Sequence, residues 1–267
     1  MKKIYFSLTL IALIPLFFAC ASSGSKKGTL DLIDIDEELK IGEAISNEVN
    51  KRYKVIEDKE VTDYFQNIGR KIADNSDWTG LDYHFFVINI SDILSFSLPG
   101  GYVYISRGFV ERADNLSEVA SILAHEIGHV VSRHGTERLV KIYGYAVSAQ
   151  AIFGENPTIY QDIVDHLFDV DGILGYSEKQ ELRATELAAK YAWKAGFDPI
   201  GLISILEKIQ TLEITNMDVV AQYQLTHPRI KKRIQTASKT ILDLASKSDL
   251  ISDSEEFQNI KKKIKDF

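Results

Sequence analysis

The segment 116–134 constrains this chain most, because it places ionisable side chains inside the apolar pattern of a buried helix. It reads H-E-I-G-H at positions 125–129, with mostly apolar neighbours. Histidines four positions apart lie one turn apart on the same helix face, so both imidazoles can reach one ion. Burying two histidines and a carboxylate without a partner is costly, and a metal ion removes that cost. The pattern therefore predicts a zinc site with His125 and His129 as ligands.

Glu126 follows the first histidine and lies about 100° around the helix from it. That position brings its carboxylate near the metal without making it a ligand. Zinc lowers the pKa of a water molecule towards neutrality and polarises a carbonyl group. We therefore predict that Glu126 is a general base, which accepts a proton from water and passes it to the leaving amine of a peptide bond.

A catalytic zinc site of this kind needs a third protein ligand. His134 lies five residues beyond His129, which on a continuous helix places it on the far side, so we predict a surface or capping histidine. A metzincin would have histidine at position 135, and this chain has Gly135 there. The remaining candidates are glutamates of a later helix, and their spacing does not choose among them: Glu178, Glu181 and Glu186.

Composition indicates an ordinary globular chain. Of its 267 residues, 45% are hydrophobic and 26% are charged, which suits one domain with a sizeable core. The formal net charge of −7 gives no indication of a nucleic-acid partner.

The N-terminus has the plan of a bacterial secretory signal. Lys2 and Lys3 precede an apolar run at 4–19 that is short for a membrane-spanning helix, and the only cysteine, Cys20, follows at once. The sequence F-F-A-C at its end is similar to a lipobox, which predicts that Cys20 carries the lipid. We therefore predict a signal peptide at 1–19, a lipid-anchor cysteine with a flexible tether at 20–35, and a protein attached to the membrane, facing the periplasm.

Periodicity predicts more helix than strand in the remaining chain, and hence an α+β class. Asn115 is predicted to cap the central helix, with Glu118 completing a capping box. We expect a domain at 36–245 and an amphipathic helix at 246–267. Residues 146–175 read as short helices and loops, and we hypothesise that they gate the site. The other expected helices lie at 36–49, 61–72, 177–195 and 199–212, and the expected strands at 83–90 and 102–106.

Four stretches together resemble the HtpX and CAAX-prenyl-protease type of zinc metallopeptidase over roughly residues 40–240. They are F-S-L-P-G-G-Y-V-Y-I at 96–105, the segment 123–135 around the H-E-x-x-H sequence, A-G-F-D-P at 195–199, and T-H-P at 226–228 followed by Arg233. The resemblance implies a mostly helical, zincin-like domain with a small β-sheet and one zinc ion per chain. Beyond the N-terminal segment the sequence has no long apolar spans, and it leaves no room for an added module. In both respects it resembles the short lipoprotein members of the family.

The resemblance also assigns roles to later residues. The family's third ligand comes from a helix reading E-x-x-A-D, which here selects Glu181, while Thr185 stands where the family has an aspartate that orients a zinc histidine. Such supporting groups typically change metal affinity or activity by about 10–100-fold. His227 would steady the oxyanion or occupy the metal's open position in a resting form, and Arg233 would support the same region.

The strand containing Gly101, Tyr102, Val103 and Tyr104 is expected at the sheet edge beside the active helix, where an extended peptide could add to it. These expectations describe a metalloendopeptidase that cleaves unfolded or misassembled envelope proteins in quality control. The alternative is a zinc-bound, weakly active or inactive homologue that acts as a periplasmic chaperone or adaptor. The change to Thr185 favours the alternative, and the intact Glu126 favours the peptidase.

Overall fold

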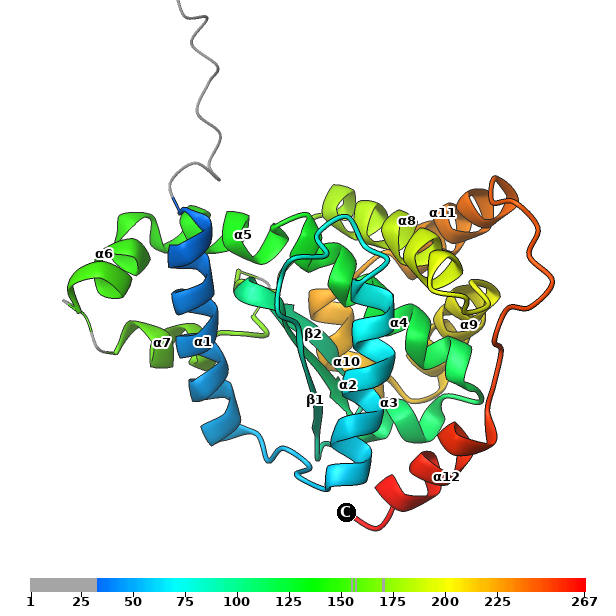
Figure 1. Ribbon diagram of the computed structural model, residues 1–267. Helices are drawn as coiled ribbons and strands as arrows, with labels where there is room; N and C mark the ends of the chain where they lie inside the picture. The colour runs from blue at the N-terminus through cyan, green and yellow to red at the C-terminus, as the bar shows by residue number, and fades with distance from the viewer. Residues whose placement is uncertain (1–32, 155, 157, 170) are drawn as a thin grey trace, which may run out of the picture.

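A computed structural model describes residues 33–267 except 155, 157 and 170. Helices dominate, and three short strands form one sheet (Figure 1). This arrangement confirms the predicted α+β class. In chain order the elements are α1 (Ile35–Arg52), α2 (Lys59–Ala73), β1 (His84–Ile88), β2 (Ser95–Leu98), η2 (Pro99–Gly101), β3 (Tyr102–Ser106), α3 (Arg107–Arg112), α4 (Leu116–Val131), α5 (His134–Tyr143), α6 (Tyr145–Phe153), α7 (Ile159–Asp165), α8 (Glu178–Lys194), α9 (Ile200–Thr215), α10 (Met217–Thr226), α11 (Ile230–Leu242) and α12 (Glu255–Ile264).

The sheet has the order β1-β3-β2, with β3 parallel to β1 and antiparallel to β2. The prediction that the strand at Gly101–Tyr104 forms the edge is therefore wrong. Tyr102, Val103 and Tyr104 lie in the central strand, whose backbone is paired on both sides. The edge strand beside α4 is β2, for which no strand was predicted. Strand order depends on contacts between distant segments, which local alternation does not encode.

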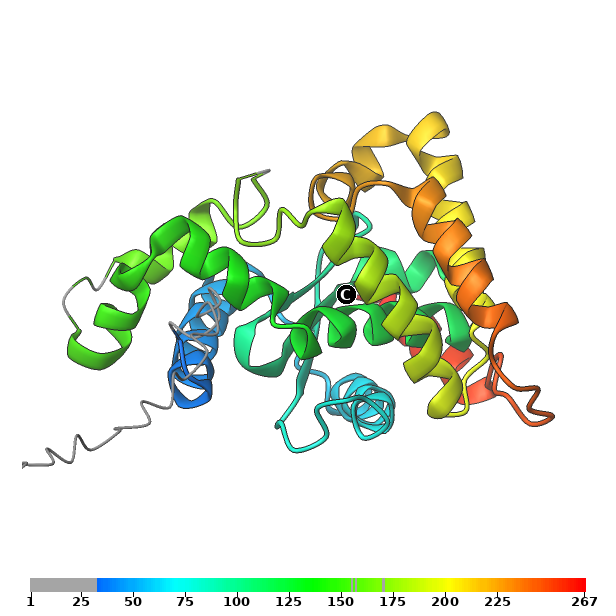
Figure 2. The ribbon, with the colours of Figure 1, turned by 90° about the horizontal axis from the view of Figure 1, so that it is seen from above.

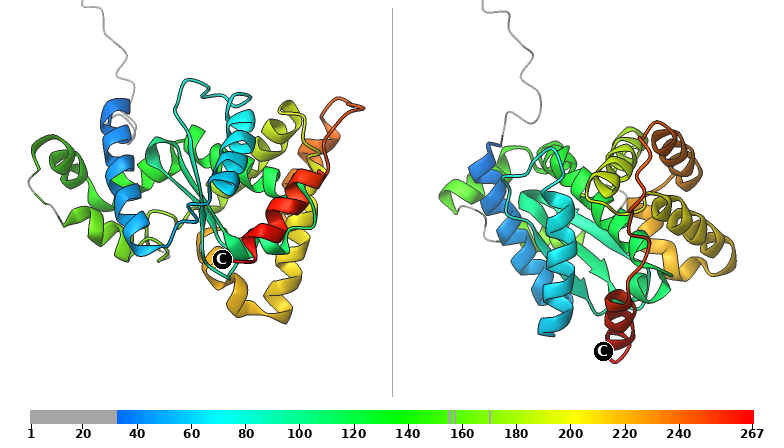
Figure 3. Two further views of the ribbon diagram at one scale, coloured as in Figure 1. Left: turned by 60° about the horizontal axis from the view of Figure 1, so that its bottom comes forward. Right: turned by 45° about the vertical axis from the view of Figure 1, so that its right-hand side comes forward.

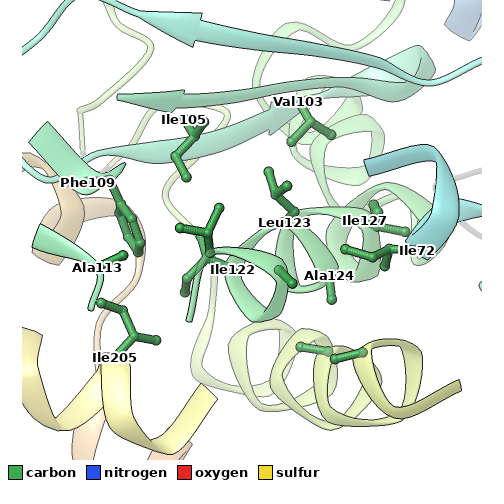
Figure 4. Close-up of a cluster of buried hydrophobic side chains, with 14 of the residues drawn as sticks. Ile72, Val103, Ile105, Phe109, Ala113, Ile122, Leu123, Ala124, Ile127 and Ile205 are labelled. Atoms are coloured by element: carbon green, nitrogen blue, oxygen red, sulfur yellow. The ribbon is translucent and has the colours of Figure 1, made fainter. Parts of the chain in front are cut away.

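The two faces of β3 serve different layers, as the period of two in a strand requires. Val103 and Ile105 point towards Ile122, Leu123 and other apolar side chains of α4 (Figure 4). Tyr104 points the other way, and its hydroxyl lies 2.7 Å from the Ser46 hydroxyl of α1. Figures 1 and 2 show α1 and α5–α7 on one side of the sheet and α8 and α9 beside α4, with α11 packed against α8 and α9.

Helix α4 begins as predicted but ends earlier. The Asn115 side chain accepts a hydrogen bond from the Glu118 amide at 3.1 Å. The Glu118 carboxylate accepts a hydrogen bond from the Asp114 amide at 2.8 Å instead of from the Asn115 amide. The predicted capping box is therefore not formed. The helix stops at Val131 because Arg133 takes a left-handed backbone conformation with φ +53°. A separate helix, α5, then begins at His134.

The left-handed turn is held by a partly buried ion pair. Arg133 Nε donates to Glu38 Oε2 at 2.6 Å, and Arg133 Nη2 donates to the Ile33 carbonyl oxygen at 2.8 Å. The Glu38 side chain is 1% exposed. The start of α1 is thereby fixed to the corner between α4 and α5.

Helices α4 and α8 lie in close contact because Gly128 has no side chain. A Cβ atom at this position would lie 3.0 Å from the Ala184 carbonyl oxygen. Helix α8 ends at Lys194, within one residue of the predicted end, and Gly196 follows with a φ of +84°, which suits a glycine after a helix. The close packing of α4 and α8 brings the first turns of α8 beside the H-E-x-x-H residues.

The C-terminal segment returns to the core (Figure 3). Phe257, Ile260 and Ile264 of α12 are buried in the same apolar cluster as α2 and α4. The predicted signal peptide, Cys20 and most of the predicted tether lie outside the described residues. Among the helices of the described chain, none has the length and apolarity needed to cross a membrane.

Candidate metal centre

Four side chains converge at the middle of α4. His125 and His129 come from α4, Glu181 from the first turns of α8, and His227 from the loop after α10. One ligand atom of each lies within 4.8 Å of those of the others, and all four residues are at most 1% exposed. All four were singled out from the sequence.

The contacts select one of the three candidate glutamates. Glu181 Oε1 lies 3.2 Å from His129 Nε2, and Glu181 Oε2 lies 3.7 Å from His125 Nε2. Glu178 lies on the exposed side of α8, where its carboxylate pairs with Lys232 at 2.5 Å. Glu186 pairs with its helix neighbours Lys190 and Arg183. Only Glu181 of these three meets the histidines.

The donor set suits a divalent cation such as zinc. Both carboxylate oxygens of Glu181 and Nε2 of His227 are buried without a hydrogen-bond partner, which is costly unless a cation satisfies them. Burial lowers the pKa of His125 and of His129 well below 6.5, so both imidazoles are neutral and can donate a lone pair. Burial acts to raise the pKa of Glu181, but the charges of His227 and Arg233 outweigh it and lower this pKa, which keeps the carboxylate ionised. Two histidines and a glutamate are a common catalytic zinc set.

Glu126 is held by two serines of the edge strand. Ser95 Oγ donates to Glu126 Oε1 at 2.7 Å, and Ser97 Oγ donates to Glu126 Oε2 at 3.1 Å. The serines are two residues apart on β2, so they share the face that meets α4. His227 Nε2 lies 3.4 Å from Glu126 Oε1. Burial acts to raise the pKa of Glu126, but His227, His129 and Ser95 outweigh it, so the pKa is lowered and the carboxylate is ionised, as a base requires.

Arg233 is a buried cation beside the cluster. Its Nη1 lies 3.4 Å from Glu181 Oε2, and its Nη2 lies 3.3 Å from His125 Nε2. Its Nε donates to Thr185 Oγ1 at 3.3 Å. The Thr185 hydroxyl donates to the Glu181 carbonyl oxygen at 2.8 Å. Nδ1 of His125 has no hydrogen-bond partner, so no carboxylate orients this imidazole.

His134 was predicted to lie away from the site, and this prediction is wrong. Because α4 ends at Val131, the chain turns and returns His134 to the cluster, where it is 6% exposed. Its Nδ1 lies 3.0 Å from Nδ1 of His129. A histidine that binds metal through Nε2 commonly donates its Nδ1 proton to a neighbour, so His134 is a supporting partner of His129. The left-handed Arg133 carries no clear sequence signal, since arginine rarely adopts this conformation.

Aromatic rings close the cluster from the outside. The Tyr176 ring stacks on His129 with centroids 4.0 Å apart, and the Tyr223 ring stacks on His227 with centroids 4.7 Å apart. A cavity of about 750 Å³ lies elsewhere, lined by residues that include Val55, Phe86 and Phe267 and by none of the four cluster residues. The four cluster residues are at most 1% exposed, so the site is closed in this conformation. Tyr176, Ser95 and Ser97 were not singled out from the sequence, although the Ser-x-Ser spacing next to L-P-G-G offered a signal for the serines.

The buried histidines make the metal-free protein sensitive to acid. Burial lowers the pKa of His134 to about 4, below the usual histidine value of 6.5. The unfolded chain then binds the proton more readily, so the free energy of unfolding falls as the pH drops from 6.5 towards 4. We expect His134→Gln to remove up to about 3 kcal/mol of this fall, measured by chemical denaturation of the metal-free protein. An unchanged pH dependence in His134→Gln would contradict this assignment.

Comparison with known proteins agrees with this geometry. Residues 59–241 match the sequence profile of Peptidase family M48. The chain is 25% identical over 214 residues to a beta-barrel assembly-enhancing protease of Yersinia pestis, covering 77% of this chain and 44% of that protein. It is 23% identical over 242 residues to the Escherichia coli K12 protein of the same name, covering 86% of this chain and 50% of that protein.

A mitochondrial metalloendopeptidase OMA1 of Arabidopsis thaliana is 26% identical over 184 residues, covering 69% of this chain and 37% of that protein. This chain thus spans half or less of the length of these relatives. The family profile covers more than half of the chain, and it includes three of the cluster's elements, α4, α8 and the loop after α10. The chain therefore belongs to Peptidase family M48 and carries the zinc metallopeptidase domain of that family.

Proposed function

We propose that this protein is a zinc-dependent metalloendopeptidase that cleaves proteins of the bacterial cell envelope in protein quality control. The observation that carries the proposal is the buried, ionised Glu126 carboxylate beside two histidines and a glutamate. The bacterial relatives are named as proteases that enhance β-barrel assembly, which supports a substrate class in the envelope.

The residues divide the chemistry between them. His125, His129 and Glu181 hold zinc, which when bound lowers the pKa of water and polarises the scissile carbonyl. Glu126 accepts the proton of the attacking water and delivers it to the leaving amine. His227, 3.4 Å from that carboxylate, steadies the developing oxyanion or occupies the open metal position at rest. Arg233 and Thr185 orient the ligands.

The site must open before a substrate enters. All four residues of β2 are buried, so a peptide can pair with this edge strand only after the covering groups move. Tyr176 follows directly after residues 146–175, and its ring covers His129. We propose that this segment together with Tyr176 gates the centre.

Replacing Tyr176 by Ala is expected to raise peptide turnover and to speed zinc removal by a chelator, each several-fold, because it uncovers His129. Stopped-flow chelation and turnover of a fluorogenic peptide measure the two effects. Trp193→Ala, a partly exposed aromatic residue near the end of α8 and outside the gating segment, is the control and leaves both unchanged. A folded, zinc-loaded Tyr176→Ala protein with wild-type rates of peptide turnover and zinc removal would contradict the gating proposal.

The cellular placement remains the one proposed from the N-terminus. A signal peptide at 1–19 and a lipid on Cys20 would hold the domain on the membrane, facing the periplasm. The bacterial relatives named above support an envelope location. The chain would then contact the membrane through its lipid anchor. Its protein partners would be unfolded or misassembled envelope proteins.

One observation favours the second candidate, a zinc-bound adaptor with weak or no activity. Thr185 provides no carboxylate to His125, whose Nδ1 is unpaired. The first test is zinc content and casein cleavage by the purified full chain. One zinc per chain with chelator-sensitive cleavage supports the peptidase, whereas bound zinc with no cleavage at any temperature at which the protein is folded supports the adaptor. Absence of zinc would overturn both candidates.

A further inference from the structure

A polar cavity lies directly outside the metal centre, between the start of α5 and the start of α8. Its volume is about 350 Å³, which is large enough for a side chain or a small ion with its water. None of its lining residues is a metal ligand. They are Ser132, His134, Glu137, Arg138, Lys141, Ser177, Lys179, Gln180 and Arg183.

The lining carries four cationic side chains and one carboxylate, in a chain whose net charge is −7. The carboxylate, Glu137, accepts a hydrogen bond from Gln180 at 3.0 Å. Among the described residues, no ion pair involves Lys141 or Lys179, and both side chains are exposed. Arg183 shares Glu186 with Lys190 outside the cavity. A cavity with this excess of positive charge attracts an anion.

The backbone adds to this attraction. Helix α8 begins at its N-cap Ser177, which lines the cavity, and α5 begins at His134, which also lines it. Helix N-termini carry partial positive charge, and at α8 the capping box between Ser177 and Gln180 leaves the amides between these two residues without a helical partner. The two helix starts and the four cations therefore act on the same volume.

One side chain joins the cavity to the metal centre. His134 lines the cavity, and its Nδ1 lies 3.0 Å from Nδ1 of His129. On the other wall, Gln180 and Arg183 flank the ligand Glu181 in sequence. The His134 imidazole therefore lies between His129 of the metal centre and the cationic walls of the cavity.

We propose that this cavity is a subsite for a carboxylate of the peptide substrate, so that the enzyme prefers acidic residues near the bond it cleaves. This inference rests on the proposed peptidase function. The carboxylate belongs to a Glu or Asp side chain or to a free peptide C-terminus. Hydrogen bonds to charged groups contribute enough for about a tenfold preference over a neutral analogue.

The test measures binding separately from cleavage. Full-chain Glu126→Gln protein, loaded with zinc, is titrated into fluorescent peptides of one sequence that carry Glu, Gln or Lys at a central position and an amidated C-terminus. A fourth peptide carries Gln and a free C-terminus, which distinguishes the two sources of the carboxylate. We expect about tenfold tighter binding of the Glu peptide, or of the free-C-terminus peptide, than of the amidated Gln peptide.

Charge reversal places the effect in the cavity. Lys141→Glu and Lys179→Glu each change an exposed side chain and are expected to abolish the preference, whereas Lys265→Glu, after α12, leaves it intact. Equal binding of all four peptides, no binding of any, or a preference that survives both reversals would overturn the inference. Charge-selective binding by a wild-type protein that cleaves nothing would instead retain the subsite and reject the peptidase function.

Discussion

Replacing Glu126 by Gln is expected to lower the rate of casein or peptide cleavage by about 10²–10⁴-fold, the usual contribution of a positioned acid–base group. Glutamine has nearly the same shape and can accept a hydrogen bond from one of the Ser95 and Ser97 hydroxyls while its amide nitrogen donates to the other, but it cannot take a proton from water. Zinc content and client binding are therefore expected to stay at wild-type levels. Cleavage assays and metal analysis on the same preparation measure both properties.

Glu118→Gln is the matched control, because Glu118 is also a fully buried glutamate of α4. Its carboxylate contacts Lys208 and Ser204, far from the reaction, so its replacement costs stability and leaves the turnover of the folded protein unchanged. Wild-type cleavage by Glu126→Gln would remove Glu126 from the mechanism. Loss of zinc in Glu126→Gln would show that this residue supports the metal instead.

The second large effect is expected for Glu181→Ala, which should lose zinc and cleavage together. The substitution removes the carboxylate that meets both histidines, and it also leaves the buried Arg233 cation without its acidic neighbour. Removing one partner of a buried ion pair typically costs about 3–5 kcal/mol, so the metal-free variant should also unfold at lower denaturant concentration. Metal analysis and denaturation curves measure these two consequences.

Glu178→Ala serves as the control on the same helix, one turn earlier, where the carboxylate is exposed and paired with Lys232. It should keep zinc, cleavage and most of its stability. If Glu181→Ala retains one zinc per chain, the third ligand lies elsewhere, and His227 becomes the first alternative. If both variants lose zinc, the effect belongs to α8 as a whole.

Features with a local cause were predictable from the sequence. The spacing of His125 and His129 defines their shared face on any helix, and the structure places their Nε2 atoms 3.0 Å apart. The apolar period of α1, α2 and α8 predicted each helix to within a few residues. Glu181 needed the family resemblance, because the period of α8 alone leaves Glu178 and Glu186 equally available.

Features that depend on distant contacts were not predictable in this way. The position of β3 at the centre of the sheet follows from its pairing with both neighbours, which no alternation pattern specifies. His134 reaches the cluster only because Arg133 turns the backbone, and that turn is held by Glu38, which lies 95 residues earlier. The Ser-x-Ser spacing next to L-P-G-G marks Ser95 and Ser97 as sharing one face of a strand, but their contact with Glu126 depends on the packing of β2 against α4.

The contacts of Arg133 also join the start of α1 mechanically to the end of α4. Arg133 is bonded to the Ile33 carbonyl oxygen and lies four residues after His129. A pull on the chain at Ile33 is therefore resisted in two places, by the Arg133 side chain at the end of α4 and by the apolar cluster in which Ile33 is buried. The corner between α4 and α5 carries part of that load close to His129.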